Sequence, residues 1–359
     1  MSMEIVKERW FRIAIGIILF LAIIWLLNEV RFIFTPLVIF VQTLFLPFLI
    51  AGILFYICRP LIQFLEQWRV PRTPAILLIF LVIIALLVLI VSLIGPVVQD
   101  QFIRLIDNIP AMISAIQNTI TYWQDNQEFI PDFAKDAVSD IGSQLQGILS
   151  TTGGFIGSFL GSVFNFVFAL VVVPFILFYL LKDREKVTPG IVKFFPKSKE
   201  TEIRQVLGDM DHALGSYIKG QLIVSSFVGF MLLIVYIFIG LDYALLLALV
   251  AMVMNVIPFL GPFLATAPAV IVAWFQDPIK VLLVIGFMIV VQQIESNLVS
   301  PRVMGRVLNV HPLTIILLIL VGGNLAGVLG MVLIIPTYAV IKVIVKHSYR
   351  LLSIRRQEE

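Results

Sequence analysis

The chain has 359 residues, of which 60% are hydrophobic and 13% charged, and its formal net charge is +3. Soluble domains carry about 45–50% apolar and about 25% charged residues, so this composition excludes a large soluble domain and predicts an all-α, polytopic membrane protein. The single cysteine, Cys58, excludes an intramolecular disulfide and a thiolate metal site, and the three histidines are far apart in sequence. We therefore expect no metal, no cofactor and no nucleic-acid partner.

Four apolar runs in the first half of the chain are long enough to cross a membrane, which takes roughly 17–25 residues. They cover residues 11–27, 32–58, 74–98 and 155–181, and Pro36 and Pro47 interrupt the second. Asn28-Glu29-Val30-Arg31 follows the first run, where a signal peptide would have a small-residue cleavage site. We interpret this run as an uncleaved first span.

Two segments between the apolar runs are polar. In residues 99–152 apolar side chains recur at helical spacing, first from Ile106 to Ile120 and again from Ile130 to Ile148, which predicts two amphipathic helices on the protein or membrane surface. Residues 182–220 form a basic helical loop. Its Asp209, Asp211 and Lys219 are expected to be solvated charges, with a gating role as the alternative.

The distribution of basic residues orients the chain, because Lys and Arg favour the cytoplasmic side. The 182–220 loop carries eight of them, whereas residues 99–152 carry Arg104 and Lys135 against seven acidic residues. Both termini and the 182–220 loop are therefore expected in the cytoplasm, and the 99–152 segment outside. This arrangement is that of a multi-pass membrane protein.

The C-terminal half has apolar runs at 221–240, 243–275, 279–299 and 311–346, and the second and fourth are broken by proline or glycine. If 243–275 crosses once, Arg302 and Arg306 lie outside, against the charge rule. If it is a re-entrant hairpin, these arginines are cytoplasmic, and 311–346 must be a hairpin too. Both topologies remain open from the sequence. The expected organisation is an N-terminal three-span segment (1–98), extracytoplasmic helices (99–152), a fourth span (153–181), the basic loop (182–220), a C-terminal core with broken helices (221–346) and a tail (347–359).

The C-terminal half also carries a series of short motifs. They are Gly215-Ser-Tyr-Ile-Lys-Gly-Gln221, Asn255-Val-Ile-Pro-Phe-Leu-Gly-Pro262, Glu295-Ser-Asn-Leu-Val-Ser-Pro-Arg-Val-Met-Gly305, His311-Pro312 and Gly322-Gly323 with Gly327, Gly330 and Pro336. In this order and spacing, over about residues 210–345, the chain resembles the autoinducer-2 exporter family, also called PerM-type permeases. The resemblance implies a secondary transporter of about eight membrane segments that works as a homo-oligomer. Some members are associated with export of the quorum signal autoinducer-2, and others with sodium or lithium/proton antiport.

The first candidate site is the break at Asn255, Pro258, Gly261 and Pro262. Backbone that leaves helical geometry inside a membrane is tolerated where it is buried in protein or lines a water-filled cavity, and in transporters such breaks form binding sites. A structural bend is the alternative interpretation.

The second candidate is the polar group Gln292, Glu295 and Asn297 in an otherwise apolar run. An ionisable residue at membrane depth is costly and suggests function. Glu295 is expected to bind a proton, a cation or the solute, with Gln292 and Asn297 orienting it. The alternative is an ion pair of Glu295 with Arg302 or Arg306 at a helix end.

Glycine-rich segments provide further candidates. Gly322, Gly323, Asn324 and Gly327 are expected either to form an unwound tip that faces the Pro258 break or to permit close helix contact. Gly153, Gly157 and Gly161 share one helix face, for contact within the protomer or between protomers. A last set of gating or helix-contact residues comes from the family motifs: Gln221, Pro301, Arg302, Gly305 and Gly330.

No catalytic or nucleotide-binding motif is present: the sequence lacks a P-loop, Gly-x-Ser-x-Gly, His-Glu-x-x-His and Cys-x-x-Cys. We therefore expect a secondary transporter and not an enzyme. The first hypothesis is export of a small polar solute of the autoinducer-2 type by alternating access. The second is monovalent cation/proton antiport, and the third is a membrane scaffold that transports nothing, against which the paired helix breaks argue.

Overall fold

The computed structural model describes residues 9–125, 171–304 and 310–358, and within those ranges the regular structure is entirely helical. Helices α1 (Arg9–Glu29), α2 (Arg31–Gln67) and α3 (Arg72–Asp125) follow one another through short turns. Five of the described helices are long and apolar enough to cross a membrane, and shorter apolar helices accompany them. The expected all-α, polytopic architecture is confirmed.

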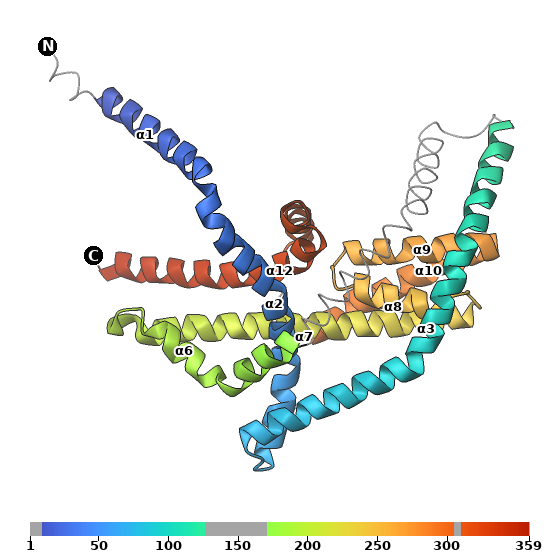
Figure 1. The fold of residues 1–359 in the computed structure, drawn as a ribbon, viewed down its shortest axis with the longest axis horizontal. Helices are drawn as coiled ribbons and strands as arrows, with labels where there is room; N and C mark the ends of the chain where they lie inside the picture. The colour runs from blue at the N-terminus through green and yellow to red at the C-terminus, as the bar shows by residue number, and fades with distance from the viewer. Residues whose placement is uncertain (1–8, 126–170, 305–309, 359) are drawn as a thin grey trace.

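Helix α3 joins two elements that the sequence separates. Its 54 residues include both the third apolar run and the first amphipathic stretch, with Pro96 and Pro110 inside the helix. In Figure 1 α3 leaves a sharp corner with α2 and passes across α8 (Ala244–Met254), α9 (Leu260–Gln276) and α10 (Pro278–Ile294). Gln101 Oε1 accepts a hydrogen bond from the Leu246 amide at 3.0 Å, so the polar face of this stretch is attached to the start of α8. The second amphipathic stretch lies outside the described residues.

Helix α7 (Glu200–Phe238) is the central element, and its 39 residues span about 58 Å. It follows helix Val171–Lys182, α6 (Arg184–Val192) and the short η2 (Lys197–Lys199). Gly240 follows the C-cap residue Ile239 with a φ of +62°, which suits glycine, and the Leu241 amide bonds back to the Tyr236 carbonyl at 2.8 Å. Helices α2, α6, α8, α10, α11 (Ser300–Met304) and α12 (Pro312–Glu358) all contact α7. Helix α7 therefore links the N-terminal arm to the C-terminal core.

Helices α8 (Ala244–Met254) and α9 (Leu260–Gln276) form a hairpin. The 11 residues of α8 extend only about 16 Å, roughly half of the ~30 Å hydrocarbon core. Gln276 Nε2, at the end of α9, donates to the Gly240 carbonyl at 2.8 Å, and Gln276 Oε1 accepts from the Asp242 amide at 3.2 Å. Because the segment ends beside the point where it began, the structure has the hairpin topology and not the single crossing.

A second hairpin lies within α12 (Pro312–Glu358). Its backbone leaves helical geometry at Ala326 and Gly327, and Gly327 has a φ of +58°. A Cβ atom on Gly322 would lie 2.6 Å from the Gly330 carbonyl oxygen, whereas eight residues of straight helix separate such groups by about 12 Å. The chain therefore folds back, as the hairpin topology requires.

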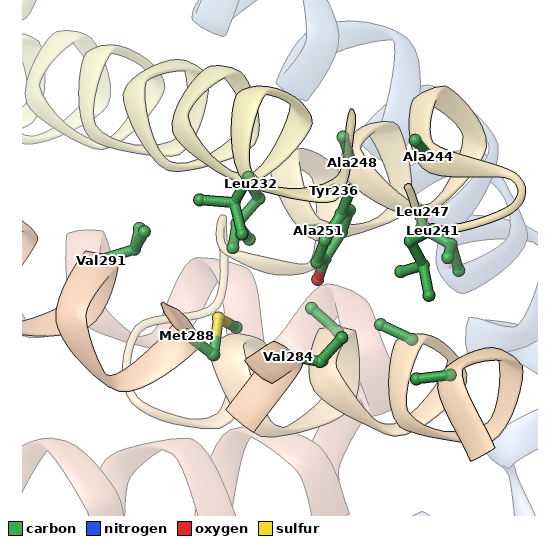
Figure 2. Packing of buried hydrophobic residues seen from close by; sticks show 14 of the residues in the cluster. Leu232, Tyr236, Leu241, Ala244, Leu247, Ala248, Ala251, Val284, Met288 and Val291 are labelled. Atoms are coloured by element: carbon green, nitrogen blue, oxygen red, sulfur yellow. The ribbon is translucent and has the colours of Figure 1, made fainter. Parts of the chain in front are cut away.

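A buried apolar cluster holds α7, α8, α9 and α10 (Pro278–Ile294) together. Figure 2 shows Leu232 and Tyr236 of α7 with Ala251 of α8 directed toward Val284 and Met288 of α10. Leu232 and Ala251 are fully buried. Because lipid tails are as apolar as these side chains, the cluster holds the helices together through close van der Waals packing, and it forms a frame for the segment between α8 and α9.

Candidate functional site

A cavity lies between the break after α8 and helix α10. It has a volume of about 870 Å³. Most of its wall is apolar, with Phe263, Met288 and Ile289 among the side chains that line it. The polar residues on its wall come from α7, the α8–α9 break, α9, α10 and the two short helical segments that follow α10: Gln221, Asn255, Thr266, Gln292, Gln293, Glu295, Ser296 and Ser300. An apolar hollow with a few convergent polar groups is the usual form of a small-molecule site.

The break between α8 and α9 forms one wall of this cavity, through Asn255, Pro258 and Pro262. Phe259, also on the wall, has a φ of +61° without being glycine, a conformation that costs about 1–3 kcal/mol and concentrates at functional sites. A Cβ on Gly261 would lie 2.9 Å from the Cα of Asn255. Gly261 therefore permits the close turn and does not itself line the cavity.

Gln221 of α7 fixes the free end of α8. Its Nε2 donates to the Asn255 carbonyl at 2.7 Å, and both residues are buried, with 6% and 5% exposure. A carbonyl at a helix end lacks an intrahelical partner, and inside a membrane it needs one from the protein. This bond satisfies it and connects two predicted residues that lie 34 positions apart in the chain.

Glu295 is the only ionisable residue on the cavity wall among those the structure describes. It begins a π-helical segment, η3 (Glu295–Val299), between α10 and α11 (Ser300–Met304). Ser300 lies near its carboxylate and lines the same cavity. Within the described ranges no ion pair involves Glu295, and Arg302 is exposed and absent from the wall. The alternative of a Glu295–Arg302 pair is therefore not realised, and Arg306 lies outside the described residues.

Gln292 and Asn297 have different surroundings, although the sequence groups them. The Nε2 atom of Gln292 is buried and has no hydrogen-bond partner, and the residue lines the cavity. Asn297 is exposed, does not line the cavity, and donates from Nδ2 to Gln293 Oε1 at 2.9 Å. The π-helical turn alters the angular spacing of the residues after Glu295, which simple helical spacing does not foresee.

The second hairpin approaches the cavity through its limbs and not through its tip. Ile315 and Ile335, one from each limb, line the cavity, whereas none of residues 322–330 does. Gly322 and Gly330 bring the two limbs into close contact, and Gly323 lies against Met331. Asn324 is exposed and donates to the Leu320 carbonyl at 3.0 Å.

The other predicted residues lie away from the cavity or outside the described ranges. Pro301 is exposed on α11, as Arg302 is. Gly153, Gly157, Gly161 and Gly305 fall on residues that the structure does not describe. Thr266, Ser296 and Ser300 were not among the predicted site residues, because isolated hydroxyl residues are common in membrane helices, although Ser296 and Ser300 lie within the motif that begins at Glu295.

A polar junction joins α2, α7 and α12 at the other half of α7. Asp211 accepts from Arg59 Nη1 at 2.6 Å and from the Tyr56 hydroxyl at 3.1 Å. Two residues earlier, Asp209 Oδ2 lies 2.8 Å from Nε2 of His347, which is 8% exposed. The expectation of ordinary solvated charges is therefore incomplete, since each aspartate is half-exposed and also binds another helix.

Comparison with known proteins identifies the family. The model of the AI-2E family transporter matches residues 14–350. The chain belongs to the AI-2E transporter family. It is 40% identical over 347 residues to YueF of Bacillus subtilis (strain 168), named as a candidate transport protein, and the match covers 95% of this chain and 94% of YueF.

More distant relatives show the range of names within the AI-2E family. A sodium-lithium/proton antiporter of Halobacillus andaensis is 20% identical, with 86% of this chain and 91% of the antiporter covered. PerM of Escherichia coli (strain K12), named as a candidate permease, is 26% identical, with 86% and 88% covered. The protein is thus a multi-pass membrane transporter of a bacterial-type family, as the motifs indicate.

Proposed function

We propose that this AI-2E family transporter moves a small polar solute of the autoinducer-2 type across the bacterial cell membrane by alternating access. The observation that carries the proposal is the cavity of about 870 Å³ between the α8–α9 break and α10, where Asn255, Gln292 and Glu295 converge. Broken helices that surround a midplane cavity are the usual binding sites of secondary transporters. Cytoplasmic termini and a homo-oligomer belong to the same proposal.

Monovalent cation/proton antiport is the second candidate. Ion coupling needs a titratable group, and Glu295 is the one such group on the described wall of the cavity. The name of the Halobacillus andaensis relative points to the same activity. A membrane scaffold without transport would have no need for a cavity between two hairpins.

Flux in proteoliposomes of the purified full-length chain tests the proposal. Autoinducer-2 efflux and sodium- or lithium-driven proton movement are measured side by side, with protein-free liposomes as the control. We expect autoinducer-2 movement that saturates with concentration. Cation-dependent proton flux alone would favour the antiporter, and the absence of both would contradict the proposed function.

A further inference from the structure

The wall of the cavity is charged at a single described position. Its other polar groups are amides and hydroxyls, and within the described part of the chain no cation faces Glu295. Electrostatic interactions are much stronger beside apolar walls than in water. A solute anion in this cavity would meet the Glu295 carboxylate without compensation, whereas a cation or a hydroxyl group would supply the partner that the carboxylate lacks.

Only some of the polar side chains on the wall are free to bind a ligand. The amide of Gln221 is bonded to the Asn255 carbonyl, the Thr266 hydroxyl to the Pro262 carbonyl at 2.7 Å, and the Gln293 oxygen to Asn297. The buried Nε2 of Gln292 is different, because nothing in the described protein accepts its hydrogens. A buried donor without a partner costs free energy until a ligand or a water molecule satisfies it.

The free donor and the free carboxylate lie close together. Gln292 and Glu295 are three positions apart at the junction of α10 with the π-helical segment, and both line the cavity. Residues at this spacing project from the same side of a helix. One small molecule can therefore contact both.

We propose that Gln292 and Glu295 form a recognition pair that selects neutral or cationic hydroxylated solutes and rejects anions of the same shape. Gln292 Nε2 donates to an acceptor oxygen of the solute, and the Glu295 carboxylate accepts from a hydroxyl or ammonium group. This assignment deepens the proposed function, on which it rests for the role of the cavity, by naming the charge class of the solute.

Solute binding to the detergent-solubilised full-length chain at pH 8 tests the proposed selectivity for the charge of the solute. The probe is radiolabelled erythritol, and the competitors share its four-carbon skeleton: unlabelled erythritol, protonated threoninol and threonate. We expect erythritol and threoninol to displace the probe, and threonate to be at least about tenfold weaker. In Glu295→Gln, threonate should compete with the probe about as well as unlabelled erythritol does, and threoninol should compete more weakly than in the wild type. Equal competition by threonate in the wild type, or no binding of erythritol and threoninol, would overturn the proposal.

Gln292→Leu separates ligand recognition from a structural role. Since it replaces an unsatisfied donor by an apolar side chain, we expect the unfolding temperature of the ligand-free chain to rise. Probe binding should weaken about fivefold, as expected when roughly one hydrogen bond is lost. A lower unfolding temperature with unchanged binding would mean that Gln292 is structural and would overturn its assignment.

Tyr236→Phe is the matched control. The Tyr236 hydroxyl is also buried without a partner, but it points into the apolar cluster and does not line the cavity (Figure 2). This substitution should raise the unfolding temperature and leave probe binding unchanged. Because binding is measured without a membrane, a chain that binds selectively but gives no flux in proteoliposomes contradicts the proposed function alone. Transport without charge selectivity contradicts only the recognition pair.

Discussion

At the residue scale, Glu295 and the glycines of the hairpins act through different physical effects. Glu295 places a carboxylate on a mostly apolar wall. Gly261, Gly322 and Gly330 contribute no group to the cavity, and instead allow backbones to approach more closely than any side chain permits. The family motifs thus combine residues for chemistry with residues for shape.

Glu295→Gln tests whether this carboxylate couples transport to protons. If it does, the substitution should remove the pH dependence of flux, because the amide cannot titrate. The yield of folded protein should be unchanged, since Gln has nearly the same shape. Glu295→Asp is the control, as it keeps a titratable group. A Gln variant with the wild-type pH profile would exclude the coupling role.

Gly330→Ala should destabilise the second hairpin. The new Cβ would collide with the Gly322 carbonyl oxygen, which as backbone cannot move aside. Overpacking of this kind costs about 1–3 kcal/mol, so we expect a lower unfolding temperature in a fixed detergent. Gly286→Ala on α10 is the matched control, because nothing lies within 4 Å of its Cβ position. Equal shifts in both variants would contradict the close contact.

At the element scale, α7 determines how the rest of the chain is arranged. One half of α7 carries Asp209 and Asp211, which bind α12 and α2, and the other half packs on α8 and α10 in the apolar cluster. Gly220 lies in between, where a Cβ would be 2.7 Å from the Met304 side chain of α11. A displacement of α7 would therefore affect both hairpins and the N-terminal arm.

The Arg59–Asp211 pair should contribute measurably to this arrangement. Its side chains are 27% and 42% exposed, so it is partly screened. We expect Arg59→Ala and Asp211→Ala each to lower the free energy of unfolding by about 1 kcal/mol, and the double variant to lose less than the sum.

The Asp100–Arg104 pair provides the comparison for this double-mutant cycle. It is an i,i+4 pair on one helix with exposures of 58% and 70%, so its coupling energy should be a few tenths of a kcal/mol at most. Unfolding midpoints in the same detergent measure both cycles. A coupling for Arg59–Asp211 no greater than that of the exposed pair would show that the contact does not hold α2 to α7.

At the scale of the whole molecule, the two hairpins decide which loops share a side of the membrane. The end of α9 and the start of α10 are bonded to the turn after α7, through Gln276 and Lys280 on the Gly240 carbonyl. Residues 242 and 279 therefore lie at the same end of the α8–α9 hairpin. The basic 182–220 loop lies at the opposite end of α7 (Figure 1). The charge rule and the hairpin geometry therefore lead to the same topology.

Cysteine accessibility tests this topology in a Cys58→Ala background, since the native cysteine is buried. Single cysteines replace the exposed residues Asp242, Ile279 and Phe194. In intact cells an impermeant thiol reagent should label the first two, and should label the third only after permeabilisation. Labelling of positions 242 and 279 from opposite sides would rule out the α8–α9 hairpin.

The sequence by itself determined that the protein is a helical membrane protein, where its C-terminal helices are interrupted, and several of the residues that line the cavity. Apolar runs longer than a bilayer core can only be helices, and proline and glycine mark where helices end. Asn255, Pro258, Pro262, Gln292 and Glu295 were therefore recognisable in the chain. Sequence spacing could not predict the contact of Gln221 with Asn255, because this contact depends on how α7 packs against the segment between α8 and α9.

Only the tertiary structure decided between hairpins and single crossings, since both satisfy the same hydropathy pattern. The deciding contacts, of Gln276 with Gly240 and of Gly322 with Gly330, join residues whose proximity depends on how the chain turns. The structure also separated Gln292 from Asn297, because a π-helical turn alters the helical spacing on which sequence analysis relies. Local sequence thus specifies where helices form and break, and long-range contacts specify which breaks become a cavity.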